Sequence, residues 1–151
     1  MTTTGRVGDQ PSDFVSYDVS EDIAPEALYR AVMYDPNNEG EVLLGVSGGV
    51  RFAGVIYAVT AARTPYGMIS GTGIPAPAGT RVTVVKSGFR PVIASGTITY
   101  GDALGMADNG ALKTLVNYDV SPTPTMLVQF CGRAQEDAED GDSFVADLRA
   151  Q

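Results

Sequence analysis

Glycine interrupts the apolar residues of this chain every few positions, and this spacing limits what the chain can form. The clearest stretch is GTRVTVVKSGFRPVIASGTITYGDALGMADNG, residues 79–110, in which no apolar run is long enough for a helix. Polar and apolar residues alternate from Arg81 to Val84, as they do in a strand with one buried face. The stretch predicts three or four short strands, with turns at Ser87-Gly88 and Asp108-Asn109-Gly110.

The composition points the same way. The chain has 151 residues with 18 glycines and no tryptophan, which favours many short strands with turns over a helical bundle. We therefore expect an all-β fold: a small single-domain β-barrel-like, β-tulip or β-sandwich structure with short strands and glycine turns. Residues 1–12 are polar and predict a flexible N-terminal arm, which leaves residues 13–151 as one β domain.

Before the glycine-rich stretch, the pattern predicts four elements. Phe14, Val15, Tyr17 and Val19 alternate partially, which predicts a first strand. Residues 21–34 fit either an amphipathic helix or a turn followed by a strand over 28–34. The strand is favoured because residues 42–46, reached through a turn at 35–40, look like its hairpin partner. The apolar run 54–59 predicts a buried central strand.

Residues 61–78 contain prolines and glycines with apolar side chains between them, which predicts an extended functional loop. Towards the C-terminus we expect a strand over 126–130, an acidic turn over 136–142 and a last strand around 144–146.

A weak internal repeat relates the two halves of the sequence. Each half would contain a turn, a hairpin, a buried strand and a closing strand, with the long Pro/Gly insertion in the first copy. The matched positions are 20–23, Leu28, Gly54 and Gly79 in the first half and 95–98, Leu104, Gly132 and Gly141 in the second.

Several classes of function are excluded or disfavoured by the residue types. Histidine is absent, which removes the commonest general base, the commonest metal ligand and every Ser-His or Cys-His pair. The net charge is −8, with ten scattered basic residues and no basic stripe for a nucleic acid. No apolar run predicts a membrane span or a signal peptide. The single cysteine, Cys131, is expected to be buried and suits assembly in a reducing cytoplasm.

The acidic clusters give no convincing site. Residues 35–40 resemble the opening of a calcium loop, but Val46 stands where such a loop needs a glutamate, so a plain turn is expected. The carboxylates of 136–142 suit a solvated turn. We predict no catalytic residue, no cofactor and no metal.

In order, the β-segments carry a resemblance to a known family. The segments are Gly54-Val-Ile-Tyr-Ala with Ala76-Pro-Ala-Gly-Thr-Arg-Val-Thr-Val, then Val92-Ile-Ala-Ser-Gly-Thr-Ile-Thr-Tyr-Gly-Asp-Ala-Leu, then Gly132-Arg-Ala with Glu139-Asp-Gly. Over about residues 20–148, this series of segments resembles the sequences of the capsid decoration, or cement, proteins of tailed bacteriophages. The resemblance implies a non-enzymatic virion protein, assembled in the host cytoplasm, that forms a homotrimer on the capsid exterior and stabilises the head by clamping the major capsid protein.

Six residues are candidates for the capsid or subunit interface: Phe14, Val15, Tyr17, Tyr66, Met68 and Ile69. They are apolar side chains beside the arm or on the Pro/Gly-rich loop. Two other classes stay open. The alternative is a small-ligand or glycan-binding β domain on a virion or cell surface, with Tyr57, Tyr66 and Tyr100 as stacking surfaces. The third is an enzyme using only carboxylates, with Asp102 and Asp108 as candidates.

Overall fold

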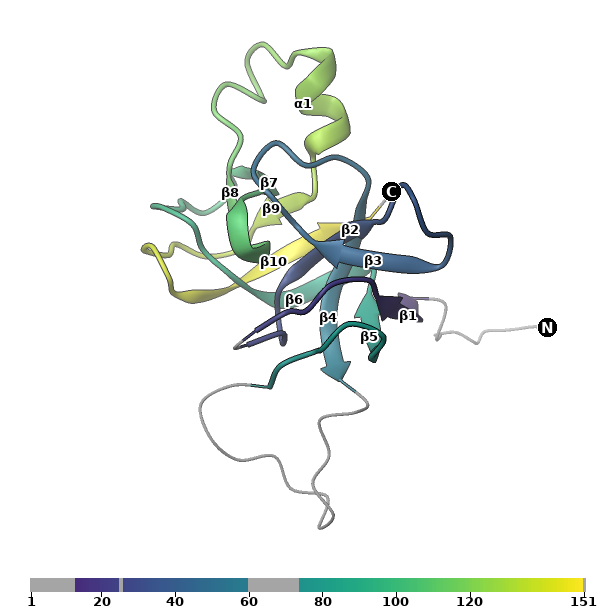
Figure 1. Cartoon of the computed structure of the whole chain (residues 1–151). Coiled ribbons are helices and arrows are strands. Elements are labelled where there is room, and N and C mark those ends of the chain that lie inside the picture. The colour runs from purple at the N-terminus through teal and green to yellow at the C-terminus, as the bar shows by residue number, and fades with distance from the viewer. Residues whose placement is uncertain (1–12, 25, 60–73, 151) are drawn as a thin grey trace, which may run out of the picture.

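The computed structural model describes residues 13–24, 26–59 and 74–150, and it contains two five-stranded sheets (Figure 1). The first sheet is a closed barrel in the order β1-β3-β2-β4-β5, and the second has the order β6-β10-β9-β7-β8. The predicted all-β, barrel-like fold is confirmed. The barrel strands are Phe14–Val19 (β1), Ala31–Tyr34 (β2), Glu41–Leu44 (β3), Phe52–Val59 (β4) and Arg81–Val85 (β5). The others are Ser87–Ile93 (β6), Ala103–Met106 (β7), Leu112–Thr114 (β8), Gly132–Ala134 (β9) and Ser143–Arg149 (β10).

The ambiguous segment 21–34 ends in a strand, not a helix. Ala31 to Tyr34 form β2, which pairs antiparallel with β3 and so makes the predicted hairpin. Alternate side chains of β2 enter different cores, because Val32 packs inside the barrel while Ala31 joins the core under the second sheet. A strand between two apolar layers buries both of its faces, which a short amphipathic helix would not do.

Two local predictions are wrong. Residues 126–130 are not a strand, because Pro124–Gln129 form a helix, α1. Pro124 lies in its first turn, where no backbone N–H is needed, and the Thr123 hydroxyl accepts a hydrogen bond from the Met126 amide at 3.1 Å. The pair Ser87-Gly88 does not turn the chain, since it begins β6, and Lys86 alone links the two sheets.

The predicted hairpin at Asp108-Asn109-Gly110 is confirmed. β7 ends at Met106, β8 begins at Leu112, and these two residues pair across the hairpin. A short 3-10 turn, η4 (Asp108–Gly110), connects the strands.

The internal repeat is present in the strand pairing. In the barrel, β1 pairs with β5, β2 with β3 and β4, and β4 with β5, all antiparallel. In the second sheet, β6 pairs with β10, β7 with β8 and β9, and β9 with β10, also antiparallel. The strands therefore match in chain order, β1 with β6 through β5 with β10. The parallel contact between β1 and β3 has its counterpart in a parallel bridge between Ala94 and Leu112.

The register corrects part of the predicted repeat. Val32 pairs with Gly54 and Leu104 pairs with Gly132, so the counterpart of Leu104 is Val32, not Leu28. The turn positions match as predicted: an isolated bridge joins Ile23 to Ala76 in the first copy, and another joins Ile98 to Ala138 in the second.

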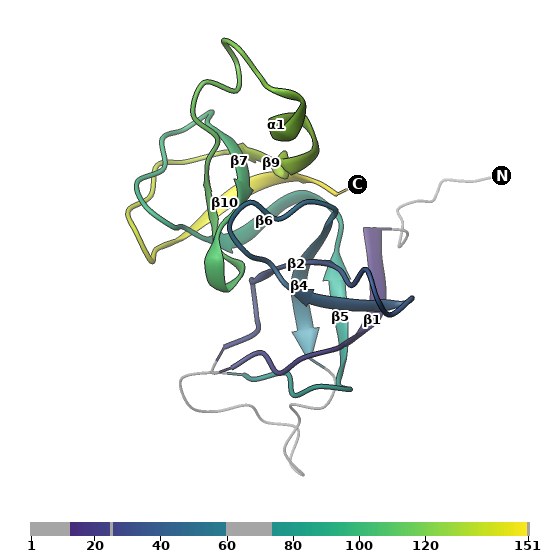
Figure 2. The same cartoon turned by 45° about the horizontal axis from the view of Figure 1, so that its top comes forward.

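One core cluster lies inside the barrel, and a second joins the two halves. The second cluster contains Leu104, Leu148 and Phe144 from the second sheet together with Ala31, Phe52 and Val55 from the first. Residues 115–131, between β8 and β9, carry α1, whereas the matching connection between β3 and β4 spans only 45–51. In Figure 1, α1 lies beyond the end of the second sheet, and Gln129 at its C-terminal end donates a hydrogen bond to the Gly48 carbonyl of the β3–β4 connection at 3.4 Å. Figure 2 shows α1 and this connection from a second direction.

Candidate interaction surfaces

The first strand places its three candidate residues in different surroundings. Phe14 is 39% exposed, Val15 is half-buried, and Tyr17 packs against the barrel core. Phe14 and Tyr17 stand on opposite faces of β1, because they are three residues apart in a strand. The structure does not gather them into one surface.

Phe14 belongs to a cluster at the junction of the two halves. Its ring meets the Tyr57 ring edge to face at 5.4 Å, and the Arg90 guanidinium lies over it at 5.1 Å. Tyr29, Tyr57, Arg90 and Pro91 line one shallow, almost wholly apolar groove. We refer to Phe14, Tyr29, Tyr57, Arg90 and Pro91 as the junction patch. Its three aromatic side chains are 38–53% exposed.

Arg90 is unusual among these residues. Its Nε is buried and makes no hydrogen bond within the described structure. The groove beside it has space for about one water molecule, about 10 Å³. A cation therefore stands at the junction patch with an aromatic ring beside it and one N–H unused.

Tyr17 lies in a separate cluster with Tyr34 and Lys86. The Lys86 ammonium donates hydrogen bonds to the Tyr34 hydroxyl and to the Ala53 carbonyl, and it lies about 5 Å from both tyrosine rings. Burial raises the pKa of Tyr17, which stays above its usual range. Burial also raises the pKa of Tyr34, but the hydrogen bonds with Lys86 and Tyr17 and the charges of Lys86 and Arg51 together outweigh it and hold that pKa below its usual range. Lys86 is the residue between β5 and β6, so its hydrogen bonds to Tyr34 and Ala53 hold the connection between the two sheets against the barrel.

A second exposed apolar surface lies on the α1 insertion, residues 115–131. Val116, Val120, Leu127 and Val128 are 48–85% exposed, and no residue of α1 is buried. Tyr118 and Phe130 stack at 4.9 Å at its base, and the Arg133 guanidinium lies beside both rings and bonds Asp119 through two contacts of 2.6 and 3.0 Å. The hydrogen bond from Arg133 lowers the pKa of Asp119.

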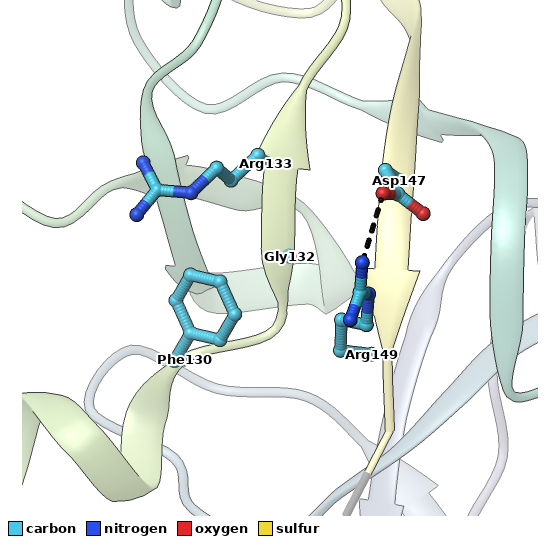
Figure 3. Close-up of a pocket in the computed structure, with 5 residues that line it drawn as sticks. All are labelled: Phe130, Gly132, Arg133, Asp147 and Arg149. Atoms are coloured by element: carbon cyan, nitrogen blue, oxygen red, sulfur yellow. Dashed lines mark hydrogen bonds and ion pairs between the residues drawn. The ribbon is translucent and has the colours of Figure 1, made fainter.

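A pocket of about 180 Å³ lies beside this base, and Figure 3 shows the five residues that line it. Phe130 and Arg133 line one side, Asp147 and Arg149 the other, with Gly132 of β9 between them. Arg149 is 3.5 Å from Asp147 and Arg133 is held by Asp119, so each arginine already has a carboxylate neighbour.

The other candidate residues are placed as follows. Tyr66, Met68 and Ile69, and residues 1–12, lie outside the described residues. Tyr57 and Tyr100 are 53% and 66% exposed, but no ring contact joins them in the described part of the chain. Asp102 and Asp108, the candidate pair of carboxylates, have different hydrogen-bond partners. Asp102 accepts hydrogen bonds from the Thr99 amide and the Thr114 hydroxyl, whereas Asp108 accepts one from the Ser47 amide.

The acidic turn has a structural explanation. Carboxylates of 136–142 accept hydrogen bonds from backbone amides, namely Glu136 from Val145, Asp137 from Tyr100, Asp140 from Gly96 and Asp142 from Glu139. Across the described ranges, no group of three His, Cys, Asp or Glu residues could hold a metal ion. Cys131 is fully buried, as predicted, and burial raises the pKa of its thiol.

The comparisons with known proteins give matches among solved structures. No protein-family model and no curated protein matches the chain. Among solved structures, the chain is similar to the head fiber gp8.5 N base of bacteriophage phi29, with a TM-score of 0.50 and 16% sequence identity. The match covers 89% of this chain and 92% of that one. The two proteins share a fold.

Sequence reasoning missed several residues of these surfaces. Arg90 gave no signal, because a lone arginine before a proline in a strand is unremarkable. The exposed side chains of α1 were assigned to a strand, because the run Met126-Leu-Val is typical of a strand as well as of a helix. The described residues contain no helix long and apolar enough to cross a membrane.

Proposed function

We propose that the protein is a structural component of a phage virion that binds the outer surface of the head and stabilises it, as a decoration or cement protein does. The observation that supports this most is the fold shared with the phi29 head fiber base over nearly the full length of both chains. The resemblance of the β-segments to decoration proteins, seen in the sequence, supports the same function. The partner under this proposal is the major capsid protein.

The chemistry of the described residues fits a role without catalysis. Asp102, Asp108 and the carboxylates of the acidic turn accept hydrogen bonds from turn amides and hydroxyls. Carboxylates bound in this way stabilise the turns. The large exposed aromatic and apolar side chains of the junction patch and of α1 are typical of protein interfaces.

We also propose that the protein is a homotrimer. The α1 insertion supports self-association, because residues 115–131 contain one charged residue, Asp119, which is paired with Arg133. Copies of a chain with a net charge of −8 repel each other least at such an uncharged surface. Light scattering after gel filtration should give three times the chain mass of 15.8 kDa. A mass of one chain at every concentration would contradict the trimer.

Binding to heads is the direct test of the function. Purified protein is mixed with DNA-filled heads prepared without it, and bound protein is measured after sedimentation. Because filled heads are closed, binding that saturates at a fixed number of copies indicates sites on the exterior. Heads that already carry the protein serve as the control and should take up none. No uptake by bare heads would refute the proposed function. A chain without residues 1–12, tested in parallel, shows whether the predicted arm contributes.

A further inference from the structure

The junction patch combines two features that single exposed side chains do not have. It is contiguous, because Phe14 touches Tyr57 and lies under Arg90, and Tyr29, Tyr57 and Arg90 line the same groove. It also draws on both halves, with β1 and β4 from the barrel and β6 from the second sheet. Exposed phenylalanine and tyrosine side chains around an arginine have the composition of an interface hot spot.

The charge of Arg90 indicates what the patch would bind. The chain has 18 acidic residues, yet no carboxylate in the described ranges forms a salt bridge with Arg90. Its neighbour is the Phe14 ring, and its Nε has no hydrogen-bond partner within the described structure. By contrast, Arg81, Arg133 and Arg149 each have an aspartate within 4 Å.

Covering this arginine with an apolar surface alone would be unfavourable, since a guanidinium removed from water needs an acceptor. A carboxylate is the acceptor that a guanidinium matches best, through two parallel N–H···O bonds. The tyrosine and phenylalanine rings around it would at the same time bury an apolar side chain. The groove is shallow, so it fits a side chain presented on a surface better than a free small molecule.

We propose that the junction patch is the face that binds the capsid, and that its partner is a segment of the capsid surface presenting a carboxylate beside an apolar side chain. This inference rests on the proposed function and names the contact that carries it. Arg90 pairs with the carboxylate, and Phe14, Tyr29 and Tyr57 cover the apolar side chain.

The test compares variants in the head-binding assay. Arg90→Met removes the charge and keeps the length of the side chain, and Tyr57→Ser removes one exposed ring. Each should weaken binding to bare heads by about tenfold or more, as loss of an interface hot spot does. Arg90→Lys keeps the charge but loses the paired hydrogen bonds and should lie between Arg90→Met and the parent. Arg149→Met is the matched control, an exposed arginine of β10, and should bind within about twofold of the parent.

Melting temperature and mass are measured for every variant, so that unfolding or a changed oligomer is not taken for lost binding. If folded Arg90→Met and Tyr57→Ser bind heads as the parent does, the inference is wrong. It is also wrong if either variant changes the mass of the free protein, because the patch would then be a contact between copies of this chain. Failure of the unsubstituted protein to bind would refute the proposed function and the inference together. Binding by the parent and by Arg149→Met, with weakened binding by Arg90→Met and Tyr57→Ser, supports both.

Discussion

At Gly110, backbone conformation and packing both require glycine. The residue has φ = +72°, and a Cβ there would stand 2.7 Å from Leu44 Cδ1 and 2.9 Å from the Ala31 carbonyl oxygen. Gly110→Ala should therefore lower the free energy of unfolding by about 2 kcal/mol or more, from strain at positive φ together with overpacking. Gly110→Val, with a branched side chain, should cost more. Chemical denaturation measures both.

Gly96 provides the control for this prediction. It has φ = +78°, close to that of Gly110, but a Cβ there would meet nothing within 4 Å. Gly96→Ala should cost about 1 kcal/mol from backbone strain alone. Equal losses at the two positions would show that packing against Leu44 and Ala31 contributes nothing.

The Asp119–Arg133 pair gives a prediction for pH dependence. The hydrogen bond from Arg133 lowers the pKa of Asp119, so the folded state favours the carboxylate. The contribution of the pair is therefore present above the ordinary pKa of aspartate and is lost as the pH falls through the lower, folded value. In an NMR titration, Asp119 should titrate below the usual range, and Arg133→Gln should return it towards that range.

Asp35 is the internal control for this titration. Its pKa is also lowered, but by hydrogen bonds from the Asn38 side chain and the Asn37 amide. It should be unchanged in Arg133→Gln. A low pKa of Asp119 that survives the substitution would mean that Arg133 is not its cause.

At the scale of single residues, sequence reasoning succeeded where a residue type has one dominant preference. The hairpin was predicted from Asn109-Gly110 because both residues tolerate positive φ. The burial of Cys131 was predicted from its apolar neighbours. It failed to find the junction patch, because Phe14, Tyr57 and Arg90 are far apart in the chain and meet only through the pairing of β1, β4 and β5 and the link to β6.

Among the elements, α1 should be the least stable. It has six residues and none of them is buried, so packing adds little to its stability. The N-cap should therefore make a large contribution to the stability of this helix. Thr123→Ala removes the hydrogen bond to the Met126 amide and about 1 kcal/mol of helix stability. Cleavage by a protease within 115–131 should become about fivefold faster, while the melting temperature of the whole protein stays nearly the same.

Ser121→Ala, two residues earlier in the same insertion, is the control and should be cleaved at the parental rate. A large drop in melting temperature for Thr123→Ala would contradict the expectation that α1 contributes little to the stability of the whole protein.

The strands were predicted better than this helix for a physical reason. The strands with a buried face show that face as alternation, so Arg81 to Val85 and the hairpin of β2 with β3 could be read directly. A helix that buries nothing has no such pattern, and its signals in the sequence were the cap and the proline, Thr123-Pro124.

For the whole molecule, the repeat was visible in the sequence as turn residues and as the strand glycines Gly54 and Gly132, because glycine and aspartate positions are constrained more tightly than apolar ones. Val32 and Leu104 occupy matching positions, yet spacing alone suggested Leu28 as the match. Strand pairing defines the two copies without ambiguity.

Although the chain is built from two copies of one arrangement, it should unfold as a single unit. Phe52, Val55 and Ala31 of the first copy lie in the same core cluster as Leu104 and Phe144 of the second. Separating the halves would therefore expose the core under the second sheet, at a cost of about 25 cal/mol for each Å² of apolar surface. Calorimetry at a constant protein concentration should show one transition.

Phe52→Ala tests this coupling. The side chain belongs to a barrel strand but is fully buried in the shared cluster, and its truncation should cost about 3–5 kcal/mol. The whole transition should move to lower temperature and remain single. Ile56→Ala, a truncation inside the barrel core, is the comparison and should shift the same transition. Two separate transitions, of which Ile56→Ala moves only one, would show that the copies are independent domains and that the shared cluster does not couple them.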